Sequence, residues 1–465
     1  MNILDILDSI NAVLWGPPSL ILLFGTGLFL TFLLKGIQFS RLKYAFKLAF
    51  SKEGNNSDSG DGDISNFKAL MTTLAATIGI GNIAGVATAV TLGGPGAIFW
   101  MWVVGLLGMA TKYAEALLAM KYRVKNSNGE YSSGPMYYIE KGLGPKFKLL
   151  AIAFAFFGAF AALGIGNSVQ SNSVADVASS SFGVPHWLTG VILIIFVSYL
   201  IYGGIQRIST VSGVFIPIMA IFYMLGAILI IVLNYNLIIP SFQLIFHHAF
   251  NPVAATGGFA GIIVAEAIRN GVARGIFSNE AGLGTAALIA GSAKADHPVK
   301  QALVAMTGTF IVTIVVCTLT GLTLIITGYW DQTGGLISGV MHDPSLEAGA
   351  LTAAAFGSAL GVIGEYIVAL SIILFGSTTI VGWYVYGEKC IEYLTGPKGI
   401  AAYRIIYIAA CGLGTVVSLQ TVWAFADMAN ALMMIPNLIA LLLLWKVIRS
   451  ETNDFFDNHY KSAKS

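Results

Sequence analysis

Long apolar stretches recur along the whole chain, each bounded by charged residues, proline or clusters of Asn, Asp and Gly. A helix needs about 20 mostly apolar residues to cross the hydrocarbon core of a bilayer. The short apolar stretch 347–360 is more typical of an interfacial or re-entrant segment. The pattern therefore predicts an all-α integral membrane protein. We expect about eleven transmembrane helices, at 12–34, 66–93, 96–120, 149–175, 187–203, 208–234, 255–290, 301–328, 361–387, 401–419 and 421–446.

The basic residues fall on one side of this pattern. All but three of the 25 lysines and arginines lie in alternate loops or in the tail, and the exceptions are Lys112, Arg269 and Arg274. The long loops 235–254 and 329–346, on the other side, contain none. Because positively charged loops stay in the cytoplasm, we expect the N-terminus outside and the C-terminus inside. The expected location is the plasma membrane of a prokaryote.

Composition supports this class of protein and excludes others. Hydrophobic residues make up 56% of the 465 residues and charged residues 10%, the latter about half or less of the share in soluble proteins. A net charge of +2 without a basic stripe excludes nucleic acid as a partner. The cysteines lack metal-ligand spacing, so we expect them to be buried small hydrophobes.

The second apolar segment is expected to be interrupted near residues 75–85. Its sequence, ALMTTLAATIGIGNIAGVATAV, places Gly79, Gly81 and Gly85 beside Thr77 and Asn82. Glycine costs about 1 kcal/mol relative to alanine inside a helix. Close packing through Gly81 and Gly85 is the alternative. An amide at bilayer depth, however, must be hydrogen-bonded, face a cavity or hold an ion. We therefore expect an unwound helix here.

The seventh apolar segment contains a second interruption, near residues 270–285. Ionised side chains at a helix centre each cost about 2.5 to 3.5 kcal/mol on insertion scales, so they are expected to face protein or water. Without this span, Lys294 and Lys300 would fall on the outer side, so we keep it. The polar residues in the segment are Glu266, Arg269, Asn270, Arg274, Ser278, Asn279 and Glu280.

The two interrupted segments each open a block of five expected spans. Interrupted helices at corresponding positions of two halves indicate the binding site of a secondary transporter. An odd repeat length inverts the second half relative to the first. We therefore expect two inverted five-helix repeats. The expected units are a peripheral helix and cytoplasmic linker (1–65), a first repeat (66–235), a second repeat (255–448) and a cytoplasmic tail (449–465).

Three sequence runs resemble the alanine or glycine:cation symporter family. They are TIGIGNIAGVATA with GGPGAIFWMW, then GIGNSVQSN, then ARGIFSNEAGLGTAA, and the resemblance extends along nearly the whole chain. It implies Na⁺-driven, or sometimes H⁺-driven, uptake of alanine or glycine. It also implies the leucine-transporter fold with one extra N-terminal helix before the five-plus-five core.

The resemblance also implies site residues. Backbone groups of Thr77 to Gly81, among them Gly79, would bind the substrate. From the seventh segment, Gly275, Ile276 and Phe277 would face them. The side chains of Asn82, Ser278 and Asn279 would complete the pocket. Gln170 would be its polar side wall. Sodium would be held by carbonyls such as those of Ala75 and Ile78, together with Leu374, Ser377 and Thr378 in the run LFGSTTIVGW. No organic cofactor and no obligatory protein partner are expected.

Alternative roles stay open for several of these residues. Gln170 could only bridge helices, and Ser377 and Thr378 could bond back to their own helix turn. For Trp383, packing is favoured slightly over capping the pocket. Lys112 and Glu115, three residues apart, favour an internal ion pair over a proton relay. Asp427 lies at a depth where Arg269 or Arg274 could reach it as an extracellular gate.

A polytopic membrane protein could be a transporter, a channel or a membrane-embedded enzyme. A Na⁺-coupled importer of alanine or glycine is favoured, and H⁺ coupling and an ion or small-solute channel are the alternatives. A membrane-embedded enzyme is disfavoured, because HExxH, GxSxG and P-loop motifs are all missing from the sequence. A pocket floored by glycine and walled by Phe277 and Gln170 is expected to exclude leucine and phenylalanine.

Overall fold

The computed structural model describes residues 3–51, 60–126, 129–250, 260–330, 348–417 and 419–460, which are almost entirely helical. The first part contains α1 (Ile3–Leu14), α2 (Pro17–Leu33), α3 (Ile37–Ser40), α4 (Leu42–Phe50), α6 (Asn66–Thr77), the 3₁₀ turn η1 (Ile80–Asn82), α7 (Ala84–Gly93) and α8 (Gly96–Tyr122). A small antiparallel hairpin follows, formed by β1 (Val124–Lys125) and β2 (Tyr131–Ser132).

The middle of the chain contains α9 (Pro135–Tyr138), η2 (Ile139–Leu143), η3 (Pro145–Phe147), α10 (Lys148–Leu163), η4 (Gly164–Ser168), α11 (Val169–Phe182), α12 (His186–Ile201), α13 (Gly204–Leu233), η5 (Tyr235–Leu237) and α14 (Ile238–Phe250). The last part contains α15 (Ala260–Asn279), α16 (Thr285–Ala290), α17 (Pro298–Thr309), η6 (Phe310–Cys317), α18 (Thr318–Ile326), α19 (Ala348–Leu360), α20 (Val362–Thr395), α21 (Pro397–Gly414), α22 (Leu419–Leu443), α23 (Trp445–Asp454) and η7 (Phe455–His459).

Six of the described helices are long and apolar enough to cross a membrane, or up to eight if each of two bent helix pairs counts as one span. One bent pair is formed by α1 and α2, and the other by α6 and α7. The expected span 187–203 corresponds to the shorter α12. The number eleven therefore stays a prediction. Exposed apolar side chains concentrate on α12 and α13, for example Ile195 and Ile218, as expected for a surface that faces lipid.

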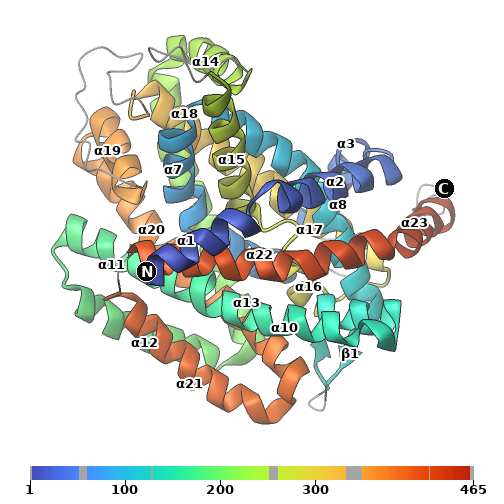
Figure 1. Cartoon of the computed structure of the whole chain (residues 1–465). Helices are drawn as coiled ribbons and strands as arrows, with labels where there is room; N and C mark the ends of the chain where they lie inside the picture. The colour runs from blue at the N-terminus through green and yellow to red at the C-terminus, as the bar shows by residue number, and fades with distance from the viewer. Residues whose placement is uncertain are drawn as a thin grey trace.

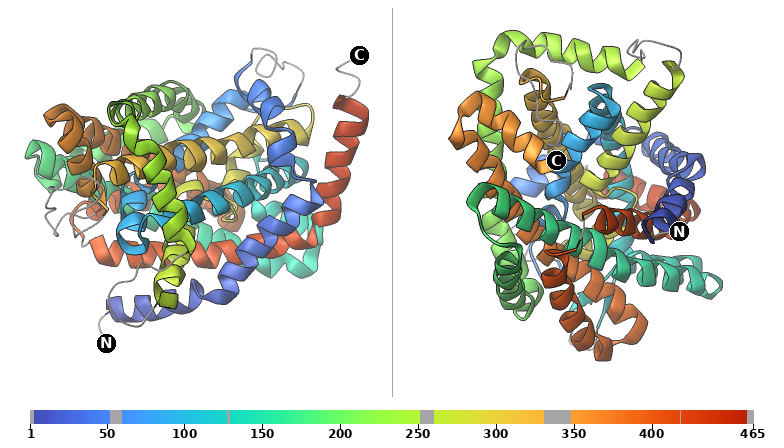
Figure 2. Two further views of the ribbon diagram at one scale, coloured as in Figure 1. Left: turned by 90° about the horizontal axis from the view of Figure 1, so that it is seen from above. Right: turned by 60° about the vertical axis from the view of Figure 1, so that its left-hand side comes forward.

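The most buried long helices are α8 and α20, and the broken helix α6–α7 contacts both of them. Helices α10 and α15 pack against this centre, and α22 packs against α10 (Figure 1). Along the outside, α1 lies against α22, whose other end leads into α23 (Figure 1). Helix α23 then turns steeply away from the direction of α22 (Figure 2, left). The two interrupted helices thus lie inside the bundle.

Two expected loops are more structured than predicted. The long loop 235–254 forms α14 over most of its length, and α14 lies across one end of the bundle against α8 (Figure 2, right). The end of the linker in segment 1–65 is likewise in contact with the bundle. Its residues 60–65 lie against the chain that follows α16, where Ile64 forms a parallel bridge with Ala293. Residues 52–59, 251–259 and 331–347 lie outside the described residues; they include the remainder of these two loops, the start of the expected span 255–290 and nearly all of the loop 329–346.

Candidate functional site

The first interruption lies where the sequence predicts it. Helix α6 ends at Thr77, Ile78 and Gly79 are extended, and η1 leads into α7 after a bend of 68°. The Asn82 side chain replaces the lost helical bonds, because its Oδ1 accepts from the Gly79 N–H at 3.0 Å. Its Nδ2 donates to Ser278 Oγ at 2.8 Å. Asn82 therefore both holds the break and joins it to α15.

Gln170 lies beside the break, as expected for a side wall. Its Oε1 accepts from the Ile80 N–H at 3.4 Å, a long contact, and its Nε2 donates to the Ile165 carbonyl at 3.1 Å. Ile165 belongs to η4, a π-helical turn, and such turns frequently occur at functional sites. In this conformation Gln170 bridges helices, which is the alternative role considered for it.

The hydroxyl that reaches the first break is one residue beyond the predicted pair. Thr379 Oγ1 donates to the Ala75 carbonyl at 3.0 Å and lies 3.4 Å from the Ile78 carbonyl. Ser377 bonds back to Ile373. Thr378 bonds back to the carbonyls of Leu374 and Phe375, both at 3.0 Å. The oxygen set at the break is thus better described with Thr379 than with Ser377.

The second interruption lies at residues 280–284, toward the end of the range predicted from sequence. Helix α15 is continuous to Asn279, so Gly275 and Ile276 are helical. A Cβ on Gly275 would lie 3.4 Å from Met101 Cα, so Gly275 packs against α8. Asn279 donates to Thr313 and accepts from the Ala281 N–H, so it caps the end of α15. Gly275 thus contacts α8 and Asn279 caps its own helix, and a role for the two residues in the substrate pocket stays a prediction.

Phe277, in contrast, lies over the first break. A Cβ built on Gly81 would be only 2.6 Å from Phe277 Cδ1, closer than side chains tolerate. The Phe277 ring stacks against Trp423 at a centroid distance of 4.7 Å. Gly81 is therefore required for the close approach of this ring, and the space above the unwound backbone is small.

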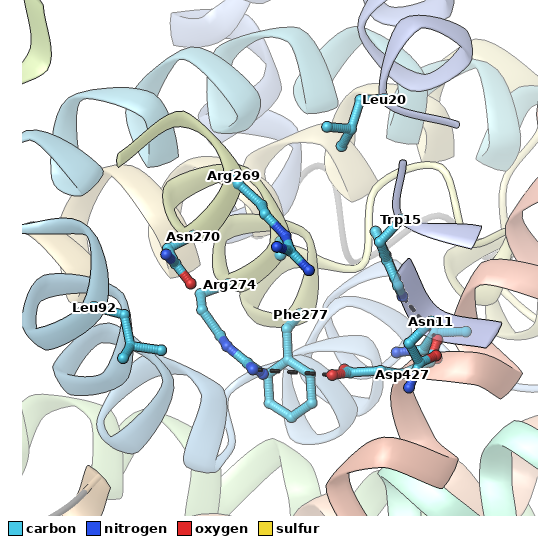
Figure 3. Close-up of a pocket in the computed structure, with 11 residues that line it drawn as sticks. Asn11, Trp15, Leu20, Leu92, Arg269, Asn270, Arg274, Phe277 and Asp427 are labelled. Atoms are coloured by element: carbon cyan, nitrogen blue, oxygen red, sulfur yellow. Dashed lines mark hydrogen bonds and ion pairs between the residues drawn. The ribbon is translucent and has the colours of Figure 1, made fainter. Parts of the chain in front are cut away.

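A cavity of about 380 Å³ lies on the other side of Phe277. Arg274 reaches across Phe277 toward Asp427 (Figure 3), with 3.9 Å between Nη2 and Oδ2. Trp15, directly after α1, donates to the Asp427 backbone carbonyl at 3.0 Å. Arg269 also lines the cavity, but its ion pair with Asp427 is not formed among the described contacts. The structure thus brings together Arg274 and Asp427 of the predicted gate.

The opposite end of the two broken helices is tied together by Arg123. Its guanidinium donates to the carbonyls of Gly291 and Ala293 after α16, at 2.9 and 3.0 Å, and to that of Asp61 before α6, at 2.8 Å. The ring of Tyr131 lies 4.2 Å from the guanidinium carbon. Burial lowers the pKa of Arg123, and the neighbouring Tyr131, Asp61 and Asp63 oppose this shift.

Sequence reasoning missed the polar network at the second break. Glu280 is buried with a left-handed φ of 57°, and it accepts from Trp383 Nε1 at 2.9 Å and from Thr285 Oγ1 at 2.8 Å. Trp383 therefore does more than pack. The expected direct pair between Lys112 and Glu115 is not formed within 4.0 Å among the described residues. The available signal was the presence of Glu280 inside an apolar segment.

The model of the sodium:alanine symporter family matches residues 1–465. The chain belongs to this family. The symporter is therefore a secondary active transporter in the membrane and not an enzyme. The sodium/alanine symporter AgcS of Methanococcus maripaludis is 52% identical over 467 residues, 100% of each chain. An uncharacterized transporter of Haemophilus influenzae is 49% identical over 99% of this chain and 98% of its own.

The fold of the symporter resembles that of solved transporters. The crystal structure of MhsT in complex with L-phenylalanine matches with a TM-score of 0.60 at 12% identity, covering 84% of this chain and 93% of MhsT. The leucine-transporter-type fold predicted from the sequence is thereby confirmed. At this identity the likeness concerns the fold alone.

Proposed function

We propose that the protein couples the entry of Na⁺ to the uptake of alanine and glycine by alternating access. One observation carries this proposal. The unwound backbone at Ile78 to Gly81 lies next to a hydroxyl, Thr379, that already contacts the free carbonyls of α6. Unwound carbonyls suit a cation such as Na⁺, and the N–H groups at the start of a half-helix suit a carboxylate.

The proposed sodium ligands are the carbonyls of Ala75, Ile78 and Phe375 and the hydroxyls of Thr378 and Thr379. The donors fit the ion, because all of them are neutral hard oxygens on two helices that already touch. This set replaces the combination of Leu374 and Ser377 expected from sequence. Bound sodium would supply the positive charge that holds the unwound end of α6 against α20.

The substrate is proposed to lie between the first break and α15. Backbone groups from Thr77 to Gly81 would bind its carboxylate and ammonium, while Gln170, Asn82 and Ser278 provide polar side chains nearby. Phe277 limits the volume, because it lies against the position where Gly81 lacks a side chain. A substrate whose side chain is a methyl group or a hydrogen, such as alanine or glycine, fits this site better than one with a branched side chain.

A flux assay in proteoliposomes tests this function. Labelled alanine and glycine are offered under an inward Na⁺ gradient, an inward H⁺ gradient, or neither. We expect saturable uptake with Na⁺ that collapses when choline replaces it. Uptake driven equally well by H⁺ alone would move the assignment to a proton-coupled transporter. Unsaturable flux without coupling would indicate a channel.

We also propose that α1 lies toward the outside of a prokaryotic plasma membrane and that the C-terminal segment lies in the cytoplasm. The loop charges support this orientation. The two inverted repeats, 66–235 and 255–448, remain part of this proposal. Labelling of single cysteines introduced at Ser9 and Lys446, with a reagent that cannot cross the membrane, tests it: only the first should react in intact cells.

A further inference from the structure

A buried charged cluster lies at the second break, apart from the proposed sodium site. It consists of Lys112 and Glu115 on α8 and Glu280 at the end of α15, with exposed fractions of 2%, 0% and 2%. If all three groups are ionised, the cluster carries a net charge of −1. Removing charges from water costs several kcal/mol per ion unless they are well paired. How these three charges are paired therefore determines how much free energy the buried cluster costs.

The pairing is incomplete on both sides. The electrostatic fields of Glu280 and Glu115 act on Lys112, but its ammonium forms no hydrogen bond and no ion pair within 4.0 Å in the described part of the chain. Glu115 Oε2 is also buried without a hydrogen-bond partner. A carboxylate in this position leaves a charged oxygen unsatisfied, at a greater cost than a neutral hydroxyl would have.

The other oxygen of Glu115 has a distinct role. Oε1 accepts from the Gly282 and Gly284 N–H groups, both at 3.0 Å, and from Asn437 Nδ2 at 2.7 Å. Asn437 also donates to the Gly282 carbonyl at 2.8 Å. Glu115 thereby joins α8, the loop before α16 and α22 at a single atom.

We propose that Glu115 is a proton-binding site that controls how tightly the second break is held. Oε2 takes the proton while Oε1 keeps its three donors. Hydrogen bonds to a neutral oxygen are about half as strong as those to a charged one. Protonation therefore loosens Gly282 and Gly284 from α8 and allows α16 to move. The inference rests on the proposed function of transport by alternating access.

The surroundings favour a proton over a metal cation. Three donors converge on Oε1, and their positive ends would repel a cation placed beside it. The Gly282 carbonyl, which shares the Asn437 Nδ2 donor with Oε1, is already a hydrogen-bond acceptor. The titratable groups that act electrostatically on Glu115 are Lys112 on its own helix, Glu280 at the break, Tyr138 on α9 and Tyr386 on α20.

The decisive variant is Glu115→Gln, which keeps an acceptor at Oε1 and imitates the protonated state. In the wild type we expect Na⁺-driven alanine uptake to fall about tenfold between about pH 6 and about pH 9, as the carboxylate forms and the break is held. The variant should keep the rate of the acidic wild type across this range. Glu130→Gln, the same change at an exposed residue, should retain the wild-type profile. A Glu115→Gln profile identical to that of the wild type overturns the proposal.

Infrared spectroscopy of the purified protein tests the proton site without transport. A carboxylic-acid C=O band that disappears as the pH rises should be present in the wild type and missing in Glu115→Gln. If this variant does not fold, Glu115→Asp serves instead and should shift the band. The same band in every variant overturns the proposal. Absence of Na⁺-driven uptake in the wild type, with the band present, contradicts the transport function and leaves the proton site standing.

Discussion

Two glycines at the first break make room for different neighbours. A Cβ on Gly79 would lie 2.7 Å from Thr379 Oγ1 and 3.2 Å from Gln170 Oε1, whereas a Cβ on Gly81 would meet the Phe277 ring. Gly79 thus permits the contact between the break and the proposed ion ligand. Gly81 permits the contact between the break and the ring that limits the substrate. Ion and substrate would therefore meet the same short backbone segment from two sides.

Thr379 can be distinguished from Ser377 by substitution. Thr379→Val keeps the side-chain shape but removes the hydroxyl that contacts the carbonyls of Ala75 and Ile78. We expect the Na⁺ concentration for half-maximal uptake to rise about tenfold, which corresponds to about 1.4 kcal/mol. Ser377→Ala, which removes a hydroxyl bonded only to its own helix, should change it by less than about twofold. Equal effects of the two changes would contradict the revised ligand set.

Phe277 should determine the size of the substrate. We expect the wild type to take up labelled alanine and glycine but to transport leucine and phenylalanine poorly. Phe277→Ala opens space beside Gly81 and should admit leucine, at a cost in stability of about 3 to 5 kcal/mol if the site does not collapse. Phe32→Ala, at a residue that is 75% exposed, is the control. Leucine uptake by the wild type as fast as alanine uptake would refute the size argument.

Some residues could be assigned from sequence and others could not, for physical reasons. Asn82 was identifiable because a buried amide needs partners, and it has them in Gly79 and Ser278. The run Ser377, Thr378, Thr379 offers two adjacent hydroxyl pairs of identical spacing. Only the rotation of α20 about its axis decides which pair faces α6, and sequence does not specify that rotation.

The two broken helices differ as elements. The first break is a short extended segment held by Asn82, whereas the second uses left-handed residues at Glu280, Gly282 and Gly284. Several glycines in the seventh segment were candidates for the break, and local propensity alone does not choose among them. The N–H groups of Gly282 and Gly284 find an acceptor on α8, so a tertiary contact selects the position. The existence of both breaks was predictable, but the position of the second was not.

Arg123 is expected to close the inner ends of both elements. Arg123→Ala removes three hydrogen bonds to carbonyls of Asp61, Gly291 and Ala293. We expect a cysteine introduced at the buried Ser292 to react at least about tenfold faster with a thiol reagent from the C-terminal side, because even one charge-assisted bond contributes about 1.5 kcal/mol. The three native cysteines are all buried, so they should contribute little to the measured reaction with the thiol reagent. Lys121→Ala, which removes a partly exposed ion pair with Glu451, should leave the rate unchanged.

The two ends of the whole molecule are closed to different degrees. At the Arg123 end, backbone pairing and short bonds join the start of α6 to the end of α16. At the other end, a cavity of about 380 Å³ is lined by residues of α1 and α15, and the long ion pair between Arg274 and Asp427 lies beside it. With the Arg123 end toward the cytoplasm, as proposed above, this is the arrangement expected before substrate binds from outside, with the inner side closed and the outer side partly open.

Asp427 tests whether the outer ion pair takes part in this alternation. Asp427→Asn removes the charge that attracts Arg274 but keeps an oxygen near its guanidinium and leaves the backbone carbonyl that binds Trp15. If closing the outer side requires this ion pair, the Asp427→Asn variant should take up alanine more slowly. In the variant, a cysteine introduced at Asn270, which lines the cavity, should also stay reactive toward a thiol reagent from outside when alanine and Na⁺ are present. Because the pair is partly exposed and screened, we expect an effect of severalfold rather than complete loss. Unchanged transport together with unchanged accessibility of both faces would exclude the gate. In that case the closure of the outer side would have to come from Phe277 and Trp423, whose rings already meet over the first break.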